Sequence, residues 1–136
     1  MENRPLRSRA MEKEISITLP YPPSINRYYR TFRGRILISK PGREYRKAVI
    51  DLTSDVVWDW EGRVAVKLEV YPPDRRKRDL DNVQKPLLDA LQHSGILEDD
   101  SLVDDLHTIR GKRMPPDGLV VATISAIEEA LTPHSS

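Results

Sequence analysis

Two acidic clusters, separated by a short amphipathic segment, are the residues of this chain best suited to chemistry. Asp79 and Asp81 stand one residue apart, and a run of three acids occupies residues 98–100. Four consecutive cations, residues 75–78, directly precede the first pair. Carboxylate oxygens are the ligands that Mg²⁺ prefers, and arginine and lysine bind phosphate. The combination predicts a phosphate-binding surface with a divalent metal, which is the chemistry of a metal-dependent nuclease.

The spacing of the acids suggests how they could share a metal. In an extended segment residues i and i+2 point to the same side, so Asp79 and Asp81 can face one ion just before a helix begins. Asp99 and Asp100 precede a predicted strand, and we expect that they could return to the same place. Lys85, four residues after Asp81 on the same helical face, could orient a phosphate or help to activate water.

Each of these residues also has a purely structural explanation. Asp81 could be only the N-cap of the following helix, and Asp79 could simply neutralise the neighbouring cations. Lys85 could form an i, i+4 surface pair with Asp89. The acidic run at 98–105 could be a solvated loop, and it lacks the spacing and central glycine of an EF-hand calcium loop.

Bulk composition narrows the class of protein. The chain has 136 residues, enough for one domain with a real core. It has no cysteine, which excludes disulfides, zinc–thiolate sites and a cysteine nucleophile. No apolar run approaches the roughly 18 residues that a membrane span needs, and the N-terminus lacks the apolar core of a signal peptide. We therefore expect a cytoplasmic protein without membrane attachment.

Charge is segregated along the chain, although the net charge is only +1. Residues 27–47 contain eight cations against one acid, whereas residues 89–105 contain six acids and no lysine or arginine. This distribution fits a protein that binds a polyanion and places acids beside it.

The basic stretch at residues 24–35 reads as a basic loop or hairpin. Arginine forks suit phosphate contacts, and interleaved aromatic rings suit stacking on exposed bases. A solvated loop is the alternative. The arginines are Arg27, Arg30, Arg33 and Arg35, and the aromatic residues are Tyr28, Tyr29 and Phe32.

Hydrophobic periodicity predicts a single α+β domain over residues 11–128, with a mixed or antiparallel sheet packed against two main helices. A disordered arm is expected at residues 1–10 and a tail at residues 129–136. The dipeptide Asp117-Gly118 is typical of tight turns, which predicts that the last two strands form a hairpin. The predicted strands are 15–19, 64–71, 103–113 and 119–127, with a possible short strand at 36–38. The predicted helices are 39–58 and one that runs from an N-cap at Asp81 or Asn82 to His93.

At these residues the chain resembles the RusA family of Holliday-junction resolvases, which are small endonucleases of bacteria and their phages. The resemblance extends from about Ile15 to Ile127. It is carried by residues 16–24 (SITLPYPPS), 26–30 (NRYYR), 73–85 (PDRRKRDLDNVQK), 89–91 and 97–100.

The resemblance implies a homodimer that binds branched DNA, above all four-way junctions, and acts in recombination and repair. It implies symmetric nicking of two opposed strands with Mg²⁺, for which Mn²⁺ is a possible substitute. By motif, the metal-binding and catalytic aspartates look like Asp79, Asp81 and Asp100, with Asp99 a weaker neighbour as a metal ligand. Lys85 corresponds to a catalytic lysine.

The expected DNA-binding residues are Arg27, Arg30, Arg33, Arg35, Arg75, Arg76, Lys77, Arg78 and Asn82. Two other functions stay open. One is a metal-dependent nuclease of broader branched-DNA specificity, and the other is a junction-binding protein that has lost turnover.

Overall fold

A four-stranded mixed sheet carries the fold of residues 13–128, the part of the chain that the computed structural model describes. The predicted arm (residues 1–10) and tail (residues 129–136) lie outside the described residues. Strand order is β1-β6-β4-β5, with β6 antiparallel to both of its neighbours and β5 parallel to β4. The bounds are β1 (Glu14–Leu19), β4 (Val64–Tyr71), β5 (Val103–Arg110) and β6 (Leu119–Ala126).

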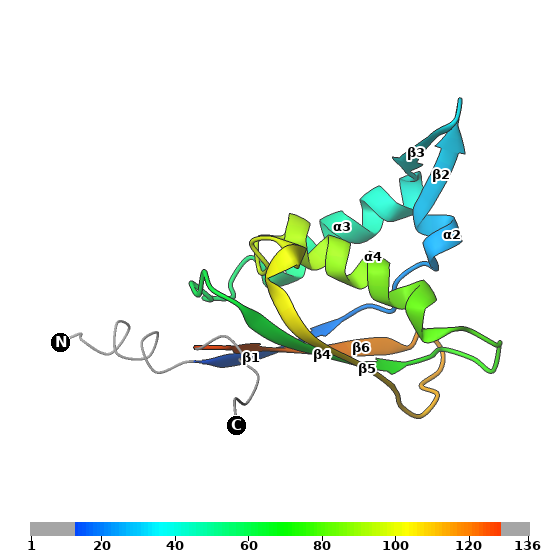
Figure 1. The fold of residues 1–136 in the computed structure, drawn as a ribbon. Helices are drawn as coiled ribbons and strands as arrows, with labels where there is room; N and C mark the ends of the chain where they lie inside the picture. Colours follow the sequence, from blue (N-terminus) through cyan, green and yellow to red (C-terminus); the bar gives the residue numbers. More distant parts are fainter. Residues whose placement is uncertain (1–12, 129–136) are drawn as a thin grey trace, which may run out of the picture.

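Alternation along the strands gives the sheet one apolar face, and two helices cover it. In β4 the residues Val64, Val66, Leu68 and Val70 are all buried, and the side chains between them are not. Helices α3 (Lys40–Thr53) and α4 (Leu80–His93) lie together over that face (Figure 1). The predicted α+β domain with two main helices is confirmed. Within residues 13–128, no helix is both long and apolar enough to span a membrane.

The predicted hairpin between the last two strands is wrong, because β4 lies between β5 and β6. Helix α4 carries the chain back over the sheet, so β5 pairs parallel to β4. Residues 111–118 then cross the end of β4 to its other side. At Gly118 φ is +68°, and an added Cβ would lie 2.6 Å from the carbonyl oxygen of Tyr71, so this crossing requires glycine.

Helix α3 is shorter than predicted, and its ends have local causes. Ser39 caps its start, because its Oγ accepts a hydrogen bond of 3.0 Å from the amide of Gly42. Near its end the hydroxyls of Thr53 and Ser54 donate to carbonyl oxygens one turn back, at 2.8 and 3.0 Å. Such side-chain bonds compete with continued helix, so α3 ends at Thr53 rather than at residue 58.

The basic stretch at residues 24–35 forms a one-turn helix and a hairpin, which confirms the hairpin alternative. The elements are α2 (Ile25–Tyr28), β2 (Tyr29–Phe32) and β3 (Arg35–Ile38). At the turn, φ is +52° at Arg33 and +74° at Gly34, the pair of positive values that suits a two-residue hairpin loop. Figure 1 shows the hairpin projecting from the helix layer, away from the sheet.

One carboxylate joins α2, α3 and α4. Asp89 accepts a hydrogen bond of 2.5 Å from the hydroxyl of Tyr28 and two of 2.8 and 3.1 Å from the guanidinium of Arg46. Burial raises the pKa of Asp89, but the bonds from Arg46 and Tyr28 outweigh it and hold the pKa below its usual value. Asp89 is therefore not a surface partner of Lys85, and Tyr28 is a buried residue rather than a base-stacking one.

We expect Asp89→Asn to lower the free energy of unfolding by about 2 kcal/mol near pH 7, because two charge-assisted bonds are lost. A carboxyl whose pKa is lowered on folding contributes stability above its unfolded pKa of about 3.9 and loses it at lower pH. The difference between variant and parent should therefore narrow below about pH 4. Urea unfolding from pH 3 to 7 measures it. Asp51→Asn, which breaks an exposed pair with Lys47, is the control, and an equal loss there would contradict the assignment.

Candidate functional site

The loop between β4 and α4, residues 72–79, is shaped by Asp74. Its Oδ1 accepts hydrogen bonds from the Arg76 amide (2.9 Å) and Arg78 Nη1 (2.7 Å), and its Oδ2 accepts one from Arg78 Nη2 (3.1 Å). The side-chain bonds from Arg78, followed by the Arg76 amide, lower the pKa of Asp74 to about 2. Asp74, rather than Asp79, therefore neutralises cations of this loop. Sequence reasoning gave Asp74 no such role.

A cavity of about 710 Å³ opens beside this loop. Five of the nine predicted DNA-binding residues line it, and they come from three separate segments of the chain. The lining also includes the acids Glu44, Asp74 and Asp117, and Asp74 is already paired with Arg78. The cations around this concavity are placed where they can meet phosphate groups. The five are Arg27 of α2, the loop residues Arg76, Lys77 and Arg78, and Asn82 in the first turn of α4.

A second hollow, of about 540 Å³, lies against the same loop and extends the basic surface. Arg75 lines it together with Arg110 and Arg113, two residues that sequence reasoning missed. The guanidinium of Arg110 donates to the carbonyl oxygen of Arg78, which ties the end of β5 to the loop. Because β4 and β5 pair in parallel, their carboxyl ends lie at the same edge of the sheet. The closeness of Arg110 to the loop therefore follows from the strand order, which the sequence pattern did not show.

The hairpin arginines lie elsewhere, above α4. A third cavity, of about 590 Å³, is bounded by the base of the hairpin and by α4. Asn26, Tyr29, Arg30 and Lys85 line it, so Arg30 and Lys85 share one concavity. The Lys85 ammonium is 6.0 Å from the centre of the Tyr29 ring, a distance at the limit of cation–π attraction.

Asp79 and Asp81 flank the start of α4. The helix begins at Leu80, so Asp79 holds the N-cap position, but its side chain makes no capping bond. Asp81 is the second helical residue, and the alternative that it is only an N-cap is wrong. The prediction that Asp79 and Asp81 lie in one extended segment is also wrong, because the helix begins between them. Both side chains belong to exposed residues and can reach a ligand.

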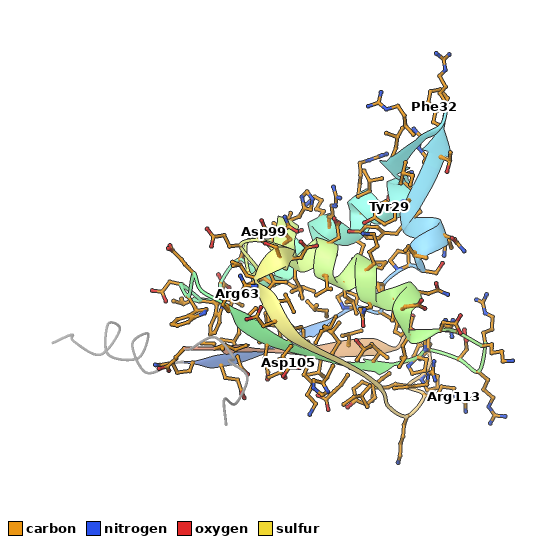
Figure 2. All side chains as sticks on the ribbon, viewed as in Figure 1. Tyr29, Phe32, Arg63, Asp99, Asp105 and Arg113 are labelled. Carbon is orange, nitrogen blue, oxygen red and sulfur yellow. The ribbon has the colours of Figure 1, made fainter. Side chains whose placement is uncertain are left out.

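Asp99 and Asp100 do not return to Asp79 and Asp81 within one chain. They follow the far end of α4, which is about 21 Å long for 14 residues. In Figure 2, Asp99 lies at the opposite end of the molecule from the loop that carries Arg113. Over residues 13–128, no group of three or more His, Cys, Asp or Glu side chains is placed to hold a metal ion.

The two neighbouring acids have different surroundings. Asp99 accepts a hydrogen bond of 3.0 Å from the amide of Ser101 and caps η1 (Asp100–Leu102), and this bond lowers its pKa. Burial, followed by the charges of Asp89 and Asp100, raises the pKa of Tyr29, although Arg46 opposes the rise. Asp100 is therefore within electrostatic reach of the ring that Lys85 also approaches. The candidate catalytic groups are arranged along α4 rather than gathered at one point.

Comparisons with known proteins identify the family of this chain. The family model described as "Endodeoxyribonuclease RusA" matches residues 20–121. A crossover junction endodeoxyribonuclease of Enterobacteria phage HK97 is 42% identical over 104 residues, which is 75% of this chain and 87% of the phage protein. The proteins of the same name from Shigella sonnei strain Ss046 and Escherichia coli strain K12 are 45% and 44% identical over 97 residues, 70% of this chain and 81% of each relative.

The family model covers the loop of residues 72–79, α4 with Lys85, and both acidic clusters. The relatives match over more than two thirds of this chain and more than two thirds of their own length. The chain therefore belongs to the RusA family of endodeoxyribonucleases.

Proposed function

We propose that this protein is a cytoplasmic homodimeric endonuclease that resolves four-way Holliday junctions in recombination and repair. It nicks two opposed strands symmetrically and depends on Mg²⁺, with Mn²⁺ as a possible substitute. The observation that carries the proposal is the cavity of about 710 Å³ that gathers predicted DNA-binding residues beside Asp79 and Asp81, in a chain of the RusA family. Relatives of this chain bear the name crossover junction endodeoxyribonuclease.

The chain's own residues have distinct tasks in this proposal. The Arg76 side chain is 81% exposed, and its ion pair with Asp74 is long, at 3.7 Å, so its guanidinium can turn to meet a phosphate. Arg78 is 22% exposed and doubly bonded to Asp74, which makes it a fixed donor at the edge of the cavity. Lys85 supplies a cation one helical turn beyond Asp81, where it binds or orients a phosphate oxygen.

The donor set limits how a metal could bind. Mg²⁺ is usually held by one or two carboxylates together with waters and substrate phosphates, and it supplies charge stabilisation at phosphate oxygens. Asp79 and Asp81 offer such a pair, but a site built from three aspartates does not fit one chain. If Asp100 also serves the site, a second copy must contribute it. A two-fold dimer would meet this requirement twice, because an isologous pair presents two equal sites.

A salt titration tests the basic surface. Each phosphate contact contributes about −0.9 to the slope of log K against log salt for duplex DNA. We expect Arg76→Ala to weaken binding to a four-way junction and reduce that slope by about one unit. Fluorescence anisotropy in chelator measures both. Arg63→Ala is the matched control, because Arg63 is exposed but paired with Asp104. Equal slopes for Arg76→Ala and its parent would refute the assignment.

Cutting and binding should be separable. Asp79→Asn and Asp81→Asn each remove a negative charge from an exposed side chain, and Asp79 makes no capping bond that the change could break. We expect nicking of junctions in Mg²⁺ to fall by orders of magnitude, with melting temperature lowered only slightly by the loss of a favourable charge at the helix N-terminus and junction affinity in chelator equal or higher. Lys85→Ala should impair nicking and weaken binding modestly. Activity that merely tracked the folded fraction would show a structural role instead.

The same assay on four-way junctions, flaps and plain duplex separates the proposed resolvase from its alternatives. Comparable nicking of flaps and junctions would favour a nuclease of broader branched-DNA specificity. Tight junction binding with no nicking by the parent chain would favour a binding protein without turnover.

Mixing two inactive variants tests the shared site. If Asp79 of one copy acts with Asp100 of its partner, a heterodimer of Asp79→Asn and Asp100→Asn has one intact site. Random pairing then restores about a quarter of the sites, because half of the dimers are mixed and each has one good site. The readout is single nicking of a cruciform plasmid after the two variants are refolded together. If both aspartates act from the same chain, no site is intact and the mixture stays inactive.

A further inference from the structure

The tip of the β2–β3 hairpin presents an aromatic ring close to two guanidinium groups. Phe32 is 49% exposed, and the Cζ atoms of Arg30 and Arg33 lie 5.6 and 5.2 Å from its ring centre. Figure 2 shows Phe32 at the far end of the projection, well away from the sheet and its core. The ring therefore contributes little to the core, and its place needs another explanation.

The hairpin is fixed at its base, so the position of the ring is defined. The carbonyl oxygen of Tyr28 accepts hydrogen bonds from the amide and the hydroxyl of Ser39, at 2.9 and 2.8 Å. Gly42 of α3 lies so close that an added Cβ would be 2.4 Å from the same oxygen. The four-residue strands then pair in register from Tyr29 to the turn. An arm held in this way loses little freedom when a ligand binds it.

The charge of the arm favours one kind of partner. Residues 25–43 contain six cations and no acid. Contact between two such arms of a dimer would bring like charges together, which is costly. A polyanion is complementary to them, and an aromatic ring among arginines is the combination that stacks on bases while the cations meet phosphates.

We propose that Phe32 is a stacking wedge that contacts the bases at the branch point of DNA, with Arg30 and Arg33 on the adjoining phosphates. This inference rests on the proposed function and adds how the branch is recognised. Plain duplex offers no free base face unless a step is unstacked, which costs a few kcal/mol, whereas stacking is already interrupted where strands exchange. Phe32 would therefore favour branched DNA over duplex.

The experiment uses a four-way junction with 2-aminopurine at the branch point, in chelator so that no strand is cut. This base brightens when it leaves the DNA stack, and anisotropy of a second label reports binding on the same samples. We expect the parent chain to raise the emission, and Phe32→Ala to abolish the rise. Phe32→Ala should weaken junction binding about tenfold and leave duplex binding unchanged, in keeping with the loss of a stacked base.

Leu52→Ala is the matched control, because Leu52 is a similarly exposed apolar residue, at 54%, on α3. It should change neither emission nor affinity. Junction binding by the parent without any rise in emission would overturn the wedge and leave the proposed function intact. Sedimentation that showed loss of the dimer in Phe32→Ala would also overturn it, because the ring would then be a subunit contact. Absence of junction binding by the parent would overturn the proposed function itself.

Discussion

The carboxylate of Asp89 is the interaction on which the arrangement of this molecule depends. It accepts hydrogen bonds from Tyr28 and Arg46 while it belongs to α4, so one side chain links three helices. Removing either donor would leave the half-buried carboxylate of Asp89 with fewer hydrogen bonds to offset its burial. The link matters beyond stability, because α2 leads directly into the hairpin and α4 carries Lys85. The position of the β2–β3 hairpin relative to Lys85 is therefore held by this carboxylate.

Charge in this protein is organised by pairing some groups and leaving others free. Asp74 holds Arg78 on the inner side of the loop, and Asp104 holds Arg63 at the other end of the sheet. The acids at 79 and 81, in contrast, stand exposed at the start of a helix. Positive backbone charge at that terminus favours a carboxylate there and disfavours a bare cation, so a metal would need phosphate oxygens as well.

Local patterns predicted local structure well and long-range structure poorly. The alternation of apolar residues predicted β4 with its observed bounds, Val64–Tyr71. Such a pattern depends only on which side chains of the strand itself are buried. Asp117-Gly118 does form a turn, but turn chemistry cannot show that a parallel crossover has already filled one side of β4. The same crossover brought Arg110 to the basic loop. The sequence identified the acidic residues, but the prediction that the two clusters meet within one chain was wrong. Their spacing in the sequence did not show that helix α4 holds them apart.

Pairing of the first and last strands has a consequence for synthesis of the protein. Strand β6 lies between β1 and β4, and its residues are the last of the sheet to be made. Until residue 126 has left the ribosome, β1 has no partner and the apolar face beneath the helices is incomplete. Contacts of such long sequence separation also form slowly. A nascent chain that lacks β6 therefore lacks the strand that joins β1 to β4. The sheet on which the basic and acidic groups are mounted is complete only when the last of its strands has been made.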